Sequence, residues 1–266
     1  MTFIQAIIIA IVEGLTEFLP VSSTGHMIIT TSLMGISSAD FTKLFTVVIQ
    51  LGAIAGVVVY YWKRFINLKD FNFYLKLIVG VIPVLIVGFL LKKKVDMLLE
   101  RVDVVAWSLL IGGVFLLFLD KIFKEEKVTT QEQMSWLDAF VVGVFQCIAL
   151  VPGVSRSAAT IAGGLYRKFN KTIAAEFSFF IAVPTMCAAT IKDLWDFKKA
   201  GFSLSSNDLM LLGLGNIVAF IVAILTLKYA MNYIVKHGFK SFGVYRILVG
   251  ATILIMLASG VNLQLI

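Results

Sequence analysis

Residues 13–26 read Glu13-Gly-Leu-Thr-Glu-Phe-Leu-Pro-Val-Ser-Ser-Thr-Gly-His26 and interrupt an otherwise apolar N-terminal region. The apolar runs on either side, 3–12 and 27–35, are each too short to cross a bilayer, because a helical span needs about 20 apolar residues. Irregular backbone at membrane depth is tolerated only where protein buries it or where it lines a wet cavity. The stretch therefore predicts a re-entrant helical hairpin with its polar tip in a buried chamber.

The composition is that of a polytopic membrane protein. Of the 266 residues, 59% are hydrophobic and only 15% are charged, which excludes an ordinary soluble domain. Segments that span a membrane must be helical here, since an isolated strand cannot satisfy its backbone in lipid. Six apolar stretches are long enough, at residues 45–62, 75–91, 104–119, 176–191, 209–227 and 242–261.

A second broken apolar region lies near the middle of the chain. Residues 136–151 lead into Pro152-Gly-Val-Ser-Arg-Ser-Ala-Ala-Thr160, and a short apolar run then reaches Tyr166. We expect a second re-entrant hairpin there. The remaining connections are polar and short, and we expect them to be solvated loops, at residues 63–72, 92–103, 121–133, 192–207 and 228–241.

The two broken regions align with each other. A shift of 132 residues places Pro20 on Pro152 and Ser23 on Ser155. Each half then consists of one hairpin followed by three spans, and an odd number of spans makes the halves an inverted-topology pair. The two tips should meet near the middle of the membrane, which makes Ser23 and Arg156 neighbours.

The predicted fold is all-α, with six transmembrane helices and two re-entrant hairpins in one integral membrane domain, 1–266. The inverted repeats cover about 1–132 and 133–266. The net charge of +7 lies mainly in short connections, as is typical beside membrane spans, so a nucleic-acid partner is not expected. Cys147 and Cys187 lie in apolar runs without metal-type spacing, and we expect two buried small hydrophobic residues. The N-terminal region lacks a cationic leader, so no removed signal peptide is expected.

Glu13 and Glu17 lie four residues apart, so on a helix they share one face and repel each other. A shared proton, a metal ion or a nearby guanidinium would relieve this repulsion, and each also prepares a carboxylate for catalysis. Carboxylates within a membrane are costly and usually functional. Glu17 is the better catalytic candidate because it is nearer the hydroxyl cluster, and Glu13 is a candidate ligand of substrate or metal.

The hydroxyl cluster consists of Ser22, Ser23 and Thr24, followed by Gly25. Hydroxyls, free N–H groups and a flexible glycine suit a backbone nest for an anionic group. The alternative is a simple N-cap for the next short helix. His26 is a candidate proton shuttle or hydrogen-bond donor to a phosphate.

Arg156 lies in the second tip between Ser155 and Ser157, which are candidate substrate ligands. Its planar fork of five donors suits bidentate contact with phosphate better than a lysine would. The alternative is an arginine that snorkels to the interface at the end of a hairpin. An inward-facing loop and a carboxylate pair that needs a counter-charge argue against that alternative.

Together these residues predict phosphoryl transfer in a membrane-buried chamber. Arg156 and backbone N–H groups would position the phosphate. Ser23 would attack it while Glu17 or His26 accepts the proton, or an activated water would attack with Ser23 only as a ligand. The alternative function is transport of a lipid phosphate or small anion, because broken helices in inverted repeats are also transporter architecture. A transporter has no use for a nucleophile beside a base, so a phosphatase is the favoured prediction.

The two signatures, residues 13–26 and Pro152-Gly-Val-Ser-Arg-Ser157, resemble those of the bacterial undecaprenyl-diphosphatase family, also called bacitracin-resistance protein. The resemblance covers essentially the whole chain and implies a similar fold of six spans, two re-entrant helix pairs and inverted halves. It implies a plasma-membrane enzyme that dephosphorylates the lipid undecaprenyl diphosphate to the monophosphate carrier used for peptidoglycan and other envelope polymers. The functional positions that it implies are Glu13, Glu17, Ser23, Thr24, His26, Ser155 and Arg156.

The resemblance also implies a divalent cation, Mg²⁺ or Ca²⁺, near Glu13 and Glu17, and a site that opens to the outer face. A homo-oligomer is compatible with the sequence, which does not specify one. One position departs from the family pattern, because Ala158 stands where a glycine is common. If that glycine provided close backbone approach or a positive φ, the alanine would disfavour the geometry of the second tip.

Overall fold

The protein is all-helical in the computed structural model, which describes residues 1–99, 101–201, 203–260 and 263. Over these residues no strand forms apart from an isolated bridge between Val128 and Phe169. The all-α prediction is confirmed. The helices are α1 (Phe3–Thr16), α2 (Ser23–Leu33), α3 (Asp40–Val48), α4 (Gln50–Tyr60), α5 (Trp62–Ile66), α6 (Phe71–Leu90), α7 (Lys92–Leu99), α8 (Val102–Ile122), α9 (Trp136–Gln146), the 3₁₀ helix η1 (Cys147–Leu150), α10 (Arg156–Tyr166), α11 (Lys171–Lys199), α12 (Ser206–His237) and α13 (Lys240–Ala258).

Six segments in the described part of the chain are long and apolar enough to span a membrane, as the sequence predicts. They are Asp40–Tyr60, which combines α3 and α4, and the helices α6, α8, α11, α12 and α13. The first is interrupted only at Ile49. Each predicted span coincides with one of these segments over most of its length, and the predicted end of the last span at residue 261 lies outside the described residues.

The predicted loops are wrong in several places. α5 and α7 form within segments predicted to be loops, and α11 and α12 extend well beyond their apolar runs. The reason is that a helix continues past the hydrocarbon layer while polar side chains stabilise it. Lys192 pairs with Asp196 one turn later at 3.0 Å, and α12 ends only at Gly238, whose φ is +69°.

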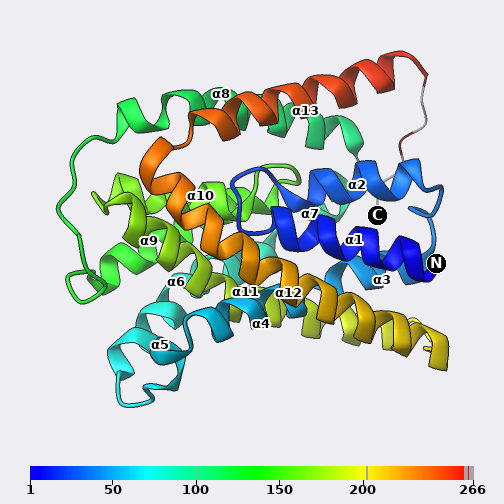
Figure 1. Cartoon of the computed structure of the whole chain (residues 1–266), viewed down its shortest axis with the longest axis horizontal. Helices are drawn as coiled ribbons and strands as arrows, with labels where there is room; N and C mark the ends of the chain where they lie inside the picture. Colours follow the sequence, from blue (N-terminus) through cyan, green and yellow to red (C-terminus); the bar gives the residue numbers. More distant parts are fainter. Residues whose placement is uncertain (100, 202, 261–262, 264–266) are drawn as a thin grey trace.

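Two pairs of short helices lie among the longer ones. α1 has 14 residues and α2, α9 and α10 have 11 each. At 1.5 Å per residue these helices rise only about 17 to 21 Å, which is less than the hydrocarbon thickness of about 30 Å. Figure 1 shows the α1–α2 pair on the right and the α9–α10 pair on the left, with their connecting loops facing each other at the centre.

The longer helices pack against these pairs, α12 against α1 and α6 against α9, and carry apolar side chains on their outer faces. Phe89, Ile111 and Leu248 are each more than 60% exposed, which suits contact with lipid rather than with water. On the inner side, helices approach closely at small residues. A Cβ added at Gly52 of α4 would lie 2.2 Å from the carbonyl oxygen of Asn216 in α12, so the contact between these two spans depends on that glycine.

Cys147 and Cys187 are free thiols, as expected, but they are half-buried and not fully buried. Both pack against the main hydrophobic cluster. The prediction of full burial is therefore wrong. A helix at the outside of a helical bundle turns one face toward the core and the other away from the protein, so its residues can be half-buried.

Candidate active site

The first tip begins where α1 ends. Glu17 is the C-terminal cap of α1, and Pro20 has no N–H with which to continue the helix. Ser22 has a φ of +71° and caps α2, its hydroxyl accepting from the N–H of Gly25. Such a φ costs about 1–3 kcal/mol in a residue other than glycine, so surrounding contacts must hold the loop.

The second tip repeats this geometry. Ser155 has a φ of +74° and caps α10, its hydroxyl accepting from the N–H of Ala158 at 3.2 Å. Ser155 therefore corresponds in conformation to Ser22 and not to Ser23. Ser23 and Arg156 are each the first residue of the helix that follows the cap.

The 132-residue shift, which pairs the two prolines, is therefore wrong by one residue at the serines: it pairs Ser155 with Ser23, whereas the backbone conformation pairs it with Ser22. The segment between proline and cap serine is Val21 in the first tip but Gly153-Val154 in the second. The additional residue is accommodated because Gly153 adopts a φ of +89°. The sequence alignment relied on the two prolines, but the feature that the two backbones share is the N-cap serine with a positive φ.

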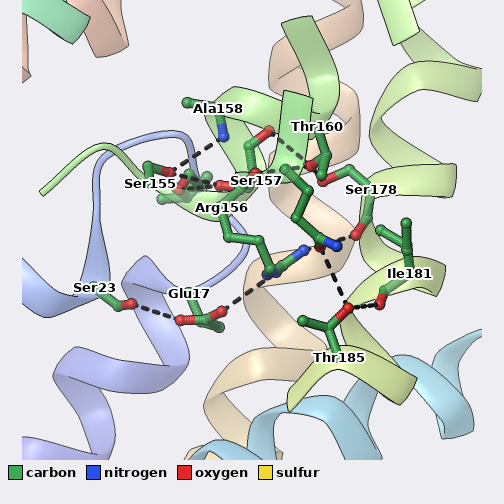
Figure 2. A network of polar contacts seen from close by, with 12 residues as sticks. Glu17, Ser23, Ser155, Arg156, Ser157, Ala158, Thr160, Ser178, Ile181 and Thr185 are labelled. Atoms are coloured by element: carbon green, nitrogen blue, oxygen red, sulfur yellow. Dashed lines mark hydrogen bonds and ion pairs between the residues drawn. The ribbon is translucent and has the colours of Figure 1, made fainter. Parts of the chain in front are cut away.

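Glu17 lies between the two tips and contacts a side chain from each. Ser23 Oγ donates to Glu17 Oε2 at 2.5 Å, and Arg156 Nη2 donates to Glu17 Oε1 at 3.3 Å. Figure 2 shows Ser23 and Arg156 on opposite sides of the carboxylate. The Glu17 side chain is 8% exposed and that of Arg156 is 12% exposed, so this ion pair is poorly solvated. A shared proton, a metal ion or a guanidinium could relieve the repulsion between the two carboxylates, and the structure shows the guanidinium of Arg156 beside Glu17.

The Arg156 guanidinium is only partly occupied by protein groups. Its Nη1 donates to the carbonyl of Ser178 in α11 at 2.8 Å, and its Nε is buried without a partner within the part of the chain that the structure describes. An unpaired N–H of this kind is costly unless another group accepts from it. Arg156 is therefore anchored at one edge with donor capacity left for an anion.

These side chains line a cavity of about 180 Å³ between the two tips. Of the residues predicted to form the site, six line it: Glu17, Ser22, Ser23, Thr24, Ser155 and Arg156. The wall is completed by Gln50, Ala149, Leu150, Pro152, Gly153 and Met186. The cavity thus has a carboxylate, a guanidinium and four hydroxyls facing one space, with apolar residues around them.

Four predicted site residues do not line the cavity: Glu13, Gly25, His26 and Ser157. Ser157 is fully buried and its hydroxyl donates to the carbonyl of Leu19 at 2.8 Å, which joins the second tip to the first. Gly25 supplies the N–H that bonds the cap of α2. The structure therefore places Ser157 and Gly25 in contacts that shape the tips.

His26 lies on α2 and is directed away from the cavity. Its Nδ1 is 2.8 Å from the carbonyl oxygen of Ser22, which can only accept, so Nδ1 carries the proton. Its Nε2 is 2.6 Å from the hydroxyl of Tyr245 in α13, and the two rings stack. In this geometry Tyr245 donates to His26, and His26 supports the strained backbone of Ser22.

Glu13 lies one helical turn before Glu17 and is fully buried. Neither of its carboxylate oxygens has a hydrogen-bond donor among the described residues. Mg²⁺ and Ca²⁺ prefer oxygen ligands, and Mg²⁺ is commonly held by one or two carboxylates together with substrate phosphate and water. No group of three or more acidic, histidine or cysteine side chains forms a metal cluster in the described ranges. The carboxylate oxygens of Glu13 and Glu17 are of the chemical kind that such a cation prefers.

The sequence prediction missed the residues that reach the tips from other helices. Gln50 of α4 lines the cavity, Ser178 of α11 orients Arg156, and Tyr245 of α13 orients His26. A further residue, Arg246, is completely buried in α13. A cation in the middle of an apolar span was a usable signal for Arg246, since such residues are rare and usually functional. Gln50 carries a weaker signal of the same kind, as a polar residue in an apolar run that is expected to form hydrogen bonds within the core, and the other two carry none.

Comparison with known proteins shows the family of the chain. A family model described as bacitracin resistance protein BacA matches residues 6–252. An undecaprenyl-diphosphatase of Flavobacterium psychrophilum is 54% identical over 256 residues, which cover 96% of each chain. An undecaprenyl-diphosphatase of Bdellovibrio bacteriovorus is 49% identical over 268 residues, which cover 100% of each chain.

The match spans both tips, five of the six long apolar segments and most of α13, and it includes every residue that lines the cavity. The chain belongs to the BacA family of bacitracin resistance proteins.

Proposed function

We propose that the protein is a membrane phosphatase that hydrolyses undecaprenyl diphosphate to undecaprenyl phosphate and inorganic phosphate. This reaction recycles the lipid carrier for peptidoglycan and other envelope polymers and confers resistance to bacitracin. The observation that carries the proposal is the Glu17 carboxylate, which contacts a serine hydroxyl of one tip and a guanidinium of the other. The undecaprenyl-diphosphatases that are 54% and 49% identical to this chain support the same substrate.

Substrate binding follows from the charges that face the cavity. The terminal phosphate accepts from the free donors of Arg156, and the hydroxyls of Thr24 and Ser155 are further donors that face the same space. Because Arg156 is anchored by Ser178, its fork is oriented before the substrate arrives. The polyprenyl tail stays among the apolar helices, where it needs no polar partner.

The first chemical step is attack by Ser23. Its Oγ forms a bond to the terminal phosphorus, the bridging P–O bond breaks, and undecaprenyl phosphate leaves with the bonding electron pair. Glu17 takes the proton from Ser23 Oγ, to which it is already bonded at 2.5 Å. Glu17 is favoured over His26 as the base because the His26 ring is bonded elsewhere and does not line the cavity.

The second step is hydrolysis of the phosphoserine. Glu17 first passes the proton that it took from Ser23 to the departing undecaprenyl phosphate. A water molecule then attacks the phosphorus, the bond from phosphorus to Ser23 Oγ breaks, and Glu17 accepts the proton of the water and returns it to Ser23 Oγ, which restores the starting state. Direct attack by water on the diphosphate, with Ser23 only as a ligand, is the competing mechanism. The short Ser23–Glu17 contact supports the serine as nucleophile, since a nucleophile and its base must lie within hydrogen-bonding distance.

The proposed cation site consists of Glu13 and Glu17. These two carboxylates would hold a Mg²⁺ or Ca²⁺ ion, and the chemistry that it would supply is neutralisation of charge on the phosphate oxygens. The unpartnered Glu13 carboxylate supports this assignment. Without a cation, the two carboxylates can share a proton, because Arg156 contacts only Glu17.

We further infer that the α1–α2 and α9–α10 pairs are re-entrant and that the two halves form inverted repeats in one membrane domain. Each helix in the two pairs is too short to span the membrane, and each pair is followed by three long apolar segments. The N-caps of α2 and α10, Ser22 and Ser155, share a positive φ. We place the opening of the cavity toward the outer face, following the family resemblance. After replacement of both native cysteines, a cysteine at Thr24 should react with an impermeant thiol reagent from outside the cell, and reaction only from inside would contradict this orientation.

Phosphate release by the purified protein tests the proposed function. Protein in detergent with Mg²⁺ or Ca²⁺ should release one phosphate per short-chain prenyl diphosphate, and E17Q should abolish release. A lack of release by folded wild-type protein would refute it. Transport is tested separately by movement of a fluorescent prenyl phosphate across proteoliposomes. Movement without hydrolysis would favour a transporter of lipid phosphate.

A further inference from the structure

Arg246 is fully buried about two turns into α13, and all five of its N–H donors are in use. Figure 1 shows α13 lying alongside α8, above the facing loops of the two hairpins. The acceptors are five backbone carbonyl oxygens: Leu109 at 3.5 Å, Pro20 at 3.3 Å, Ser108 at 3.0 Å, and Val154 and Gly153 at 2.9 Å each.

No carboxylate pairs with Arg246 in the described ranges of the chain. An unpaired buried cation is costly, and charge-assisted bonds to carbonyl oxygens are the compensation that this site offers. Because no donor is left, the guanidinium cannot also bind a phosphate. Its role must therefore lie in the backbone that it holds.

The backbone in question belongs to both tips. Pro20 is in the first tip, and Gly153 and Val154 are in the second, while the other two acceptors lie on α8. A single nitrogen, Nη1, donates to both Pro20 and Val154, so one guanidinium fixes the distance between the two loops.

These carbonyls directly precede the catalytic positions. Pro20 lies two residues before the cap serine of α2, and Val154 lies immediately before the cap serine of α10. Both caps, Ser22 and Ser155, have positive φ values, which persist only when neighbouring contacts over-determine them. Loss of the carbonyl contacts would let both caps relax and would move Ser23 and Arg156.

We propose that Arg246 is a positioning residue that holds the two tips in register, so that Ser23 and Arg156 meet at Glu17. The proposal that this register serves catalysis rests on the proposed phosphatase function. The relative position of the two tips does not depend on that function, and it can be measured without any substrate.

Gly112 of α8 gives an independent way to disturb the same contact. A Cβ at this position would lie 2.4 Å from Arg246 Nη2, so G112A should displace the guanidinium without altering it. Gly213 is a matched control in α12, because a Cβ there meets no atom within 4 Å. Arg101 is a matched control for loss of an arginine, since it is exposed and pairs only locally with Asp103.

The test compares R246K, R246M and G112A with G213A and R101M in purified full-length protein. Amide hydrogen exchange of the peptides that contain residues 20–25 and 152–158 should rise about tenfold or more in the first three variants, while exchange in α12 and the thermal midpoint stay near wild type. Phosphate release should fall about 100-fold in R246M and G112A, as for a displacement of roughly 1 Å. R246K, which keeps the charge and some donors, should retain more activity than R246M, and both controls should match wild type.

Wild-type exchange at both tips in R246K and G112A would overturn the proposal, as would faster exchange confined to one tip. A rise in exchange throughout the molecule with a lowered thermal midpoint in these two variants would also overturn it and make Arg246 a residue of general stability. If R246M does not fold, R246K and G112A still decide. If wild-type protein releases no phosphate, the phosphatase function fails while the exchange comparison still tests the register of the tips.

Discussion

Arg156 Nη2 lies 3.3 Å from Glu17 Oε1, although the two residues are 139 positions apart. The contact joins the tip of one hairpin to the end of the other hairpin's first helix. It gives a buried carboxylate a counter-charge, and Arg156, which lines the cavity, keeps an Nε–H without a partner among the described residues. The proposed catalytic set therefore draws on both halves of the chain.

Removal of the Ser23 hydroxyl tests the nucleophile. S23A should lower the rate of phosphate release by about 1000-fold or more, since a missing nucleophile leaves only positioning and charge. The measurement is phosphate release at saturating substrate, with S259A as a control at an exposed serine of the C-terminal region. Activity near wild type in S23A would support direct attack by water.

Arg156 should not be replaceable by lysine. R156K keeps the charge but loses the planar fork that reaches Glu17, Ser178 and the phosphate together, so kcat/KM should fall about 100-fold. The matched control is R101K, at an exposed arginine where charge alone should suffice. Equal activities of R156K and wild type would show that the fork is not needed.

Glu13 is expected to affect the cation requirement. After treatment with a chelator, E13Q should need about tenfold or more Mg²⁺ or Ca²⁺ for half-maximal activity, because one of two carboxylate ligands becomes neutral. E126Q, at an exposed glutamate, should behave as wild type. An unchanged cation dependence in E13Q would indicate that Glu13 only shares a proton with Glu17.

His26 should act through the backbone of Ser22. H26Q can retain a side-chain donor toward the Ser22 carbonyl, so it should keep much more activity than H26A, which should lose about tenfold or more. Y245F removes the donor to Nε2 and should have a smaller effect than H26A. A loss in H26Q as large as that in S23A would instead identify His26 as the base.

Ala158 should be well suited to its position. It is an ordinary helical residue of α10 with a negative φ, and its N–H bonds the Ser155 cap, so the tip does not require a glycine there. A158G should lower the free energy of unfolding by about 0.5–1 kcal/mol and leave phosphate release unchanged. A clear rise in activity in A158G would revive the expectation that alanine disturbs the second tip.

The sequence was informative wherever a residue type conflicts with its surroundings. Glu13, Glu17 and Arg156 are charged groups in apolar regions, and the six spans are long apolar runs, so both could be predicted. The extent of α11 and α12 could not, because helix propagation through polar residues depends on local pairs such as Lys192 with Asp196.

Which serines of the two tips correspond could be decided only from the backbone conformation. Matching prolines suggested that Ser23 aligns with Ser155, but a backbone dihedral is not visible in residue identity, and the positive φ values pair Ser22 with Ser155. The position of Ser157 also depends on the tertiary structure. Its sequence context resembles that of a substrate ligand, but its hydroxyl donates to the carbonyl of Leu19 and it does not line the cavity.

The sequence by itself determined that the chain is a helical membrane protein with two polar interruptions that carry acid, hydroxyl and guanidinium groups, because apolar length and buried charge are local properties. Only the tertiary structure decided which groups meet. Contacts such as Glu17 with Arg156, or Arg246 with both tips, join segments distant in the chain, and their geometry depends on how all the helices pack at once.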